Sequence, residues 1–276
     1  MYHNLLYSLM KNTKNKTSKG KQIFRIILFA GTFISLWFVP WILVKAWILP
    51  LPNTIQAQVD QTLSYGFDGV IVYVDEAGKP PAFYSAGYHN RELKIPANPK
   101  ALFKIASISK LYVAVAITKL ANDNHLSLDK TVADYFPELV GRIENADKIT
   151  LRMMVQHRSG IPNFTDNPDF WKNQPNTNID VLQYALDLSA DFEPNKDYGY
   201  SNTNYLLLSR IIEKVVGYSR QQYFKEEILI PLGLNNTYGS INEVDSNDIM
   251  SGYYAGLEED FKSEDAGMVA TAQDVG

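Results

Sequence analysis

Ser107 and Lys110 are the two residues whose types and spacing point most directly to chemistry. A serine hydroxyl becomes a strong nucleophile only when a base takes its proton, and a lysine amine can be that base when it is held neutral. The pair lies where a short extended segment enters a long, mostly apolar helix, and three residues of helix place both side chains on one face. Burial and the positive end of a helix both favour the neutral form of a lysine in such a place. The pair therefore predicts an activated serine.

The spacing of this pair is not specific by itself. Ser-x-x-Lys occurs four times, starting at Ser8, Ser18, Ser107 and Ser127, and only the copy at Ser107 precedes an apolar helix. The alternative is that Ser107 caps the helix and that Lys110 is a solvated residue of the first turn. On spacing alone both interpretations stay open.

Tyr200 and Asn202 form a second candidate element, directly before an amphipathic helix. A phenol beside a lysine can relay the proton that a serine gives up. An asparagine carboxamide can donate to a substrate carbonyl and accept from a substrate N–H. Tyr-x-Asn also begins at Tyr2 and Tyr88, so the alternative is a loop tyrosine packed on the helix, with Ser201 or Asn202 as its N-cap.

Composition argues against several other kinds of site. The 276 residues include no cysteine, and the four histidines are scattered without a His-Glu-x-x-His motif, so no metal site is predicted. No glycine-rich nucleotide-binding motif occurs, so no cofactor is predicted. The first fifty residues carry seven of the 26 basic residues and no acid, which leaves 19 basic against 30 acidic residues. This acidic main body argues against nucleic acid as a partner.

The N-terminal region predicts a membrane anchor. Residues 26–44 are uncharged and as one helix would extend about 29 Å, close to the thickness of a bilayer core. Because lysines precede this run, the positive-inside rule places a basic tail, residues 1–25, in the cytoplasm and the rest of the chain outside. We expect a single-pass signal-anchor over 26–47 in the cytoplasmic membrane, in contact with the lipid bilayer, and a linker over 48–60. A cleaved signal peptide and a buried soluble helix are the alternatives.

The rest of the chain predicts an α+β fold. The β-branched run 69–74 indicates a buried strand, and residues 81–87 an antiparallel partner. Helices are expected over 54–65, after Ser107, and over 149–157, 180–189, 203–216 and 221–230. Two paired strands are too little sheet to bury both faces, and the capping pattern Thr271-x-x-Asp274 predicts a helix that starts five residues before the last residue. We therefore expect this domain to continue beyond residue 276.

Six segments, taken in order, resemble the serine β-lactamase-related family of class C β-lactamases, D-alanyl-D-alanine carboxypeptidases, D-aminopeptidases and esterases. They are FKIASISK (103–110), LSLD (126–129), QHRSGIP (156–162), YSNTNY (200–205), PLGL (231–234) and GMVATAQD (267–274). The ordered set covers about residues 60–276 and is more specific than either catalytic motif alone. The resemblance implies a β-lactamase/transpeptidase-like antiparallel sheet flanked by helices, a helical subdomain, and a serine hydrolase domain over 61–276 that lacks its C-terminal strands.

The resemblance also implies roles for four residues. Ser107 is the acylated nucleophile and one backbone oxyanion donor, Lys110 its base partner, Tyr200 the proton relay and Asn202 the contact with the substrate amide. The family's second oxyanion donor and its Lys-Thr-Gly or His-x-Gly motif lie on a later strand. Because losing one oxyanion donor typically costs about a hundred- to a thousandfold in rate, we expect the 276-residue form to be an inactive fragment. His157, within the third segment, is expected to be a packing residue without chemistry.

Two classes of function remain. One is a membrane-anchored serine hydrolase acting outside the cytoplasmic membrane on D-Ala-D-Ala-type peptides, β-lactams or small esters. The other is a non-catalytic, penicillin-binding-like sensor or binding module. A Ser-His-Asp hydrolase is disfavoured because no Gly-x-Ser-x-Gly motif is present.

Overall fold

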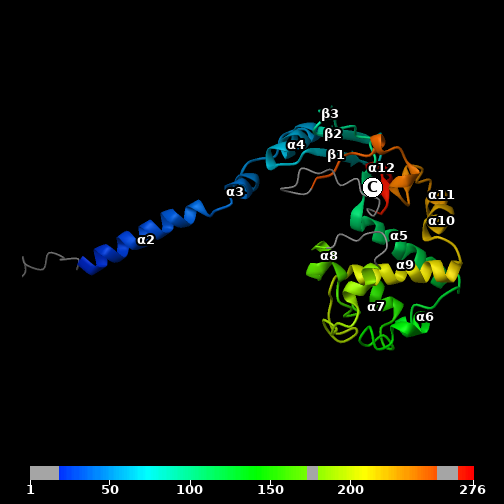
Figure 1. Cartoon of the computed structure of the whole chain (residues 1–276). Coiled ribbons are helices and arrows are strands. Elements are labelled where there is room, and N and C mark those ends of the chain that lie inside the picture. The colour runs from blue at the N-terminus through cyan, green and yellow to red at the C-terminus, as the bar shows by residue number, and fades with distance from the viewer. Residues whose placement is uncertain (1–18, 173–179, 254–266) are drawn as a thin grey trace, which may run out of the picture. The chain divides into compact units, whose positions relative to one another are not determined.

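The computed structural model describes residues 19–172, 180–253 and 267–276 (Figure 1). The chain divides into two compact units, Met1–Thr54 and Ile55–Gly276. The boundary between these units falls inside the predicted linker, residues 48–60.

The first unit contains two helices, α2 (Lys19–Trp37) and α3 (Trp41–Ile48), which meet at an angle of 79°. The prediction of one unbroken helix across this region is wrong. Pro40 lies at the break, where its ring and missing N–H disfavour a continuing helix. Of the residues described, no single helix is long and apolar enough to cross a membrane, although the bent pair meets that requirement by length and composition alone.

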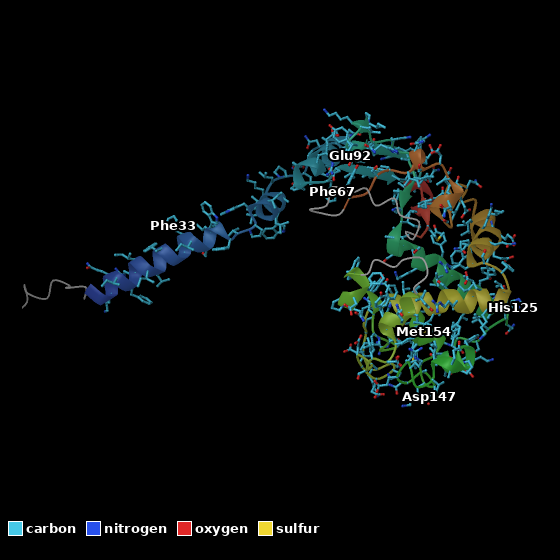
Figure 2. The ribbon with its side chains drawn as sticks, viewed as in Figure 1. Phe33, Phe67, Glu92, His125, Asp147 and Met154 are labelled. Atoms are coloured by element: carbon cyan, nitrogen blue, oxygen red, sulfur yellow. The ribbon has the colours of Figure 1, made fainter. Side chains whose placement is uncertain are left out.

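Large apolar side chains are exposed along both helices of this unit. Phe33, labelled on α2 in Figure 2, is 73 % exposed, and Trp47 on α3 is 91 % exposed. Within this unit, both helices thus carry large apolar side chains that no other part of the unit covers.

The second unit begins with α4 (Ile55–Thr62) packed against an antiparallel sheet. The sheet has the order β1–β2–β3, and its strands are Gly69–Val74, Ala82–Asn90 and Ile95–Pro96. Gly69 pairs with Gly87, and Val74 with Ala82, so the predicted pairing of the first two strands is confirmed. Gly87 has a φ of +75°, and a Cβ there would overlap the Asp68 carbonyl oxygen, so this position requires glycine.

A second, smaller sheet joins segments that are far apart in sequence. Its order is β4–β6–β5, with all pairs antiparallel, and its strands are Phe103–Lys104, Val269–Ala270 and Thr237–Tyr238. Two-residue strands carry no periodic pattern, and the sequence did not predict this sheet. It fixes the chain just before Ser107.

Helices make up the rest of the unit, and α5 lies between the first sheet and the helical part (Figure 1). Their bounds are α5 Ser109–Asn122, α6 Val132–Tyr135, α7 Leu151–Val155, α8 Pro168–Lys172, α9 Asn202–Val216, α10 Arg220–Phe224, α11 Ile230–Leu232 and α12 Ala272–Val275. Apolar faces of α5, α7 and α9 meet in the core, where Ile117, Met154 and Leu208 have no exposed surface; Figure 2 labels Met154 there. The predicted α+β class is confirmed.

Two helix predictions need correction. Residues 180–189 form only the 3₁₀ turn Val181–Ala185, because Asp180 caps the turn and Leu186 is already extended. Residues 221–230 are not one regular helix, since a π-helical turn, Lys225–Leu229, separates α10 from α11. The amphipathic helix predicted over 203–216 is confirmed as α9.

Candidate active site

Ser107 lies on a tight turn between the small sheet and helix α5. The 3₁₀ turn Ala106–Ile108 contains it, and the N–H of Ile105 just before the turn donates to the Met268 carbonyl at 3.1 Å. Ala106 has a φ of +44°, a left-handed conformation that is uncommon for a residue with a Cβ. Such conformations persist where the surrounding structure holds them in place, and here the turn leaves Ser107 exposed.

The Ser107 hydroxyl contacts both predicted partners. Its Oγ lies 2.8 Å from the phenol oxygen of Tyr200, and Lys110 Nζ donates to Oγ at 3.1 Å. Helix α5 has Ile108 at its N-cap and no side-chain cap hydrogen bond, so the interpretation of Ser107 as a helix cap is wrong. Lys110 is half-buried, with its Nζ 5.2 Å from the ring centroid of Tyr200. The structure thus brings the three residues together.

The phenol of Tyr200 ionises more readily than an ordinary tyrosine. Burial raises the pKa of Tyr200. Hydrogen bonds with Lys110 and Ser107 and the positive charge of Lys110 together lower it by more, so the pKa lies below the usual 10.0. A phenol with a lowered pKa is better able to accept and return a proton near neutral pH.

Asn202 lies beside Tyr200, with its carboxamide bonded inside the protein. The Tyr200 phenol lies 3.4 Å from Asn202 Oδ1, a long hydrogen bond. Asn202 Nδ2 donates to Asn163 Oδ1 at 3.1 Å and to Thr165 Oγ1 at 3.2 Å. Sequence reasoning missed Asn163 and Thr165, because both lie outside the six segments that carry the resemblance.

His157 packs beneath the site. Its ring stacks on Tyr200 at 4.6 Å between centroids and contacts the Tyr205 ring at 5.0 Å. The backbone N–H of Ser201 donates to His157 Nδ1 at 3.1 Å, so the proton of the neutral ring is on Nε2. Burial, and secondly the charge of Lys110, lower the pKa of His157 below its usual 6.5. The expected packing residue thus directly contacts the phenol.

Buried polar side chains connect the third segment, residues 156–162, to helix α9 by hydrogen bonds. Ser159 Oγ donates to Asn204 Oδ1 at 2.7 Å, and Asn204 Nδ2 lies 3.5 Å from His157 Nδ1. Gly160 has a φ of +78°, and a Cβ there would overlap the Phe192 carbonyl oxygen. Buried polar chains are stabilising when every member is satisfied, and this chain ties the segment 156–162 to helix α9, which begins two residues after Tyr200.

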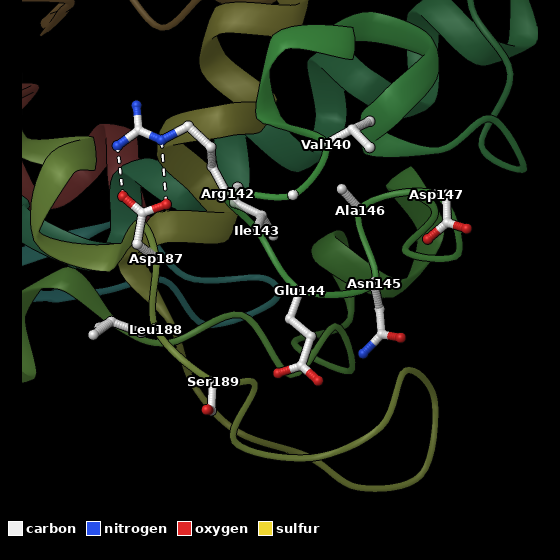
Figure 3. A pocket seen from close by; sticks show the side chains of 11 residues that line it. Val140, Arg142, Ile143, Glu144, Asn145, Ala146, Asp147, Asp187, Leu188 and Ser189 are labelled. Atoms are coloured by element: carbon white, nitrogen blue, oxygen red, sulfur yellow. Dashed lines mark hydrogen bonds and ion pairs between the residues drawn. The ribbon is translucent and has the colours of Figure 1, made fainter.

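A separate hollow of about 590 Å³ lies in the helical part and takes no part in this site. Residues 140–147 and 187–189 line it, and Figure 3 shows the Arg142–Asp187 ion pair at one side. Neither Ser107 nor any of its predicted partners lines this hollow. Within the described parts of the chain, no group of three or more His, Cys, Asp or Glu residues could hold a metal ion.

Comparisons with known proteins agree with this architecture. The chain is 33 % identical over 175 residues to penicillin-binding protein 4* of Bacillus subtilis, and 28 % identical over 193 residues to protein flp of Staphylococcus aureus; the matches cover 62 % and 68 % of this chain. It spans about two fifths of the length of these curated relatives, 38 % and 39 %.

Among solved structures, D-amino acid amidase from Ochrobactrum anthropi superposes with a TM-score of 0.69 and 27 % identity, over 81 % of this chain and 67 % of the amidase. This match confirms the predicted β-lactamase/transpeptidase-like fold. The model of the β-lactamase family matches residues 51–276, more than half of the chain. The chain therefore belongs to the β-lactamase family.

Proposed function

We propose that this chain is part of a serine hydrolase that forms an acyl-enzyme on Ser107. The observation that carries the proposal is the contact of one exposed hydroxyl with both an amine and a phenol, at 3.1 and 2.8 Å. A nucleophile within hydrogen-bonding reach of a base, which is itself oriented by a third group, is the arrangement that activates serine. Family membership and the similarity to an amidase support the same reaction class.

We take Lys110 as an ammonium in this proposal, which leaves Tyr200, 2.8 Å from Ser107 Oγ, as the group that takes the serine proton. A lysine ammonium has three donors and no acceptor, and Lys110 donates to Ser107 Oγ. The hydroxyl hydrogen of Ser107 then points to Tyr200, whose ionised form accepts it as Oγ attacks the substrate carbonyl. The protonated phenol next gives this proton to the leaving group as the bond from the acyl carbon breaks. In this proposal Lys110 stabilises the phenolate before attack, and Tyr200 takes the role of base that the resemblance assigned to Lys110.

Water completes the cycle in the proposed mechanism. The phenolate takes a proton from a water molecule that attacks the acyl carbon, and the same proton returns to Ser107 Oγ when the ester bond breaks. Substrates of the proposed enzyme are D-Ala-D-Ala-type peptides, β-lactams or small esters. Similarity to a penicillin-binding protein and to a D-amino acid amidase supports amide-like acyl donors among these.

We also propose that residues 19–48 attach the protein to the cytoplasmic membrane, with the tail inside and the domain outside. Exposed apolar side chains on α2 and α3 support this proposal, as do the basic residues that precede the apolar run. The full chain should stay with membranes after alkaline carbonate extraction, while a form that begins at residue 51 should become soluble. Release of the full chain by carbonate, or protection of its domain from protease in intact spheroplasts, would contradict the proposal.

Labelling with a fluorescent fluorophosphonate tests the proposed activity. We expect stoichiometric labelling of the full-length protein, no labelling of Ser107→Ala, and ordinary labelling of Ser127→Ala. Ser127 is a matched control because it has the same spacing to a lysine, Lys130, but its hydroxyl accepts only a local backbone bond from Asp129. Labelling that persists in Ser107→Ala would refute the proposal, and acylation by a β-lactam without later turnover would indicate the sensor alternative.

A further inference from the structure

The carboxamide of Asn202 is held in a single orientation by Asn163. The backbone N–H of Asn202 lies 3.0 Å from one side-chain atom of Asn163. Because a backbone N–H only donates, that atom of Asn163 must be the acceptor, Oδ1. The Asn202 side-chain atom 3.1 Å from the same Oδ1 must then be the donor, Nδ2. The assignment of oxygen and nitrogen in Asn202 thus follows from a backbone group whose role is fixed.

The surrounding bonds agree with this assignment. Asn163 Nδ2 donates to a carboxylate oxygen of Asp166 at 3.0 Å, which keeps Asn163 Oδ1 turned toward Asn202. The second hydrogen on Asn202 Nδ2 goes to Thr165 Oγ1 at 3.2 Å. Both hydrogens of this amide are therefore used within the protein. The group of Asn202 that faces the Tyr200 phenol is the carbonyl oxygen, Oδ1.

We infer that Asn163 is a specificity-determining positioning residue, which makes Asn202 an acceptor, and not a donor, toward the substrate. The inference rests on the proposed acyl transfer at Ser107. Oδ1 has two lone pairs, and the Tyr200 oxygen 3.4 Å away donates to neither of them once it is ionised as proposed above. A substrate N–H or ammonium beside the scissile carbonyl satisfies this oxygen, whereas a substrate without a donor leaves it unpaired, at a cost in transition-state binding.

This inference changes the role that the sequence suggested for Asn202. A contact in which Asn202 donates to a substrate carbonyl requires one of two existing bonds, to Asn163 or to Thr165, to break first. A contact in which it accepts requires no rearrangement. The site should therefore select acyl donors such as amino acid and peptide derivatives that carry N–H on the α-nitrogen, and should disfavour N-alkylated analogues.

Two esters that differ only at the α-nitrogen test the inference. They are the phenyl ester of N-benzoylglycine, which carries an N–H, and that of N-benzoylsarcosine, which carries a methyl group in place of this hydrogen. Phenol release is followed through the first turnover, so that acylation is measured even where deacylation is slow. For the full-length protein we expect kcat/KM to favour the N–H ester by about ten- to a hundredfold. The ratio is read within each variant, so a general loss of activity or of folded protein cancels.

Variants of Asn163 then test the cause of the preference. Asn163→Leu removes the acceptor at similar size and should reduce the ratio to within about threefold of one, because the Asn202 amide is free to turn. Thr165→Val removes the second acceptor with a smaller change in shape, and it should also lower the ratio if Asn163→Leu does not fold.

Three outcomes would overturn the inference: a ratio near one in the unmodified protein, an unchanged ratio in Asn163→Leu or Thr165→Val, or release from neither ester. Fluorophosphonate labelling of the unmodified protein distinguishes failure of this inference from failure of the proposed function. The reagent carries no N–H, so its reaction with Ser107 does not depend on Asn202 as an acceptor. Labelled Ser107 without ester selectivity refutes only the role of Asn163. An unlabelled Ser107 refutes the acyl-transfer proposal itself.

Discussion

Replacing His157 with phenylalanine should make the stability of the domain less dependent on pH. The ring is 9 % exposed and stacks on Tyr200, and its Nδ1 accepts the N–H of Ser201. Phenylalanine keeps a stacking ring but offers no acceptor, so the buried N–H loses its partner. An unsatisfied buried donor costs about 1–3 kcal/mol, and we expect His157→Phe to be less stable than the unmodified protein by this amount at pH 7.5.

The difference in unfolding free energy between the unmodified protein and His157→Phe should become smaller as the pH is lowered. Burial lowers the pKa of His157 in the folded protein, while an unfolded histidine has a pKa of about 6.5. Above pH 6.5 both states are neutral and the ring contributes fully to stability. Below pH 6.5 the unfolded chain binds a proton that the folded chain does not. The free energy of unfolding therefore decreases as the pH decreases, until the pH is below the lowered pKa of the folded protein. The limiting slope for one proton is about 1.4 kcal/mol per pH unit, which is enough to remove the difference within about one to two units.

Urea unfolding monitored by tryptophan fluorescence between pH 5 and 8 measures both proteins under the same conditions. Because each comparison is made at one pH, titration of all other groups cancels in the difference. His125→Gln, at an exposed position, controls for the removal of a histidine elsewhere. A difference in unfolding free energy that stays constant from pH 8 to pH 5 would show that the His157 ring is not a buried neutral acceptor.

Two further predictions concern stability alone. Gly160→Ala should destabilise the domain by about 1–3 kcal/mol or more, because its positive φ and the nearby backbone carbonyl leave no room for a Cβ; equal urea midpoints would contradict this. Asn204→Leu should cost about 1–3 kcal/mol because it leaves the Ser159 hydroxyl without its acceptor, whereas Asn122→Leu, at an exposed site on α5, should change stability by less than about 0.5 kcal/mol.

Elements with a strong periodic pattern could be predicted from the sequence. The β-branched run of β1 and the amphipathic pattern of α9 gave the right element at nearly the right bounds. The continuous apolar run before residue 48 gave the wrong shape, because its composition fits a single span while Pro40 breaks the helix within it. The small sheet was missed because its pairing, such as Phe103 with Ala270, depends on contacts between distant segments.

The sequence named the candidate residues but not the contacts that hold them. Motif spacing and order led to Ser107 and Tyr200, whose oxygens the structure places 2.8 Å apart. Asn163 has no such signal, because its effect depends on one hydrogen bond from a backbone N–H thirty-nine residues later. His157 was expected to pack, yet the stacking partner and the ring tautomer follow only from three-dimensional contacts.

The central claim, that the Tyr200 phenol takes the proton of Ser107, is tested most directly by the pH dependence of fluorophosphonate labelling. In the unmodified protein the labelling rate should rise with pH and level off at a pH below 10, because the pKa of Tyr200 is lowered. In Tyr200→Phe the rate should fall by about a hundred- to ten-thousandfold and lose that rise. Labelling of Tyr200→Phe at the unmodified rate, with the same pH profile, would contradict the account.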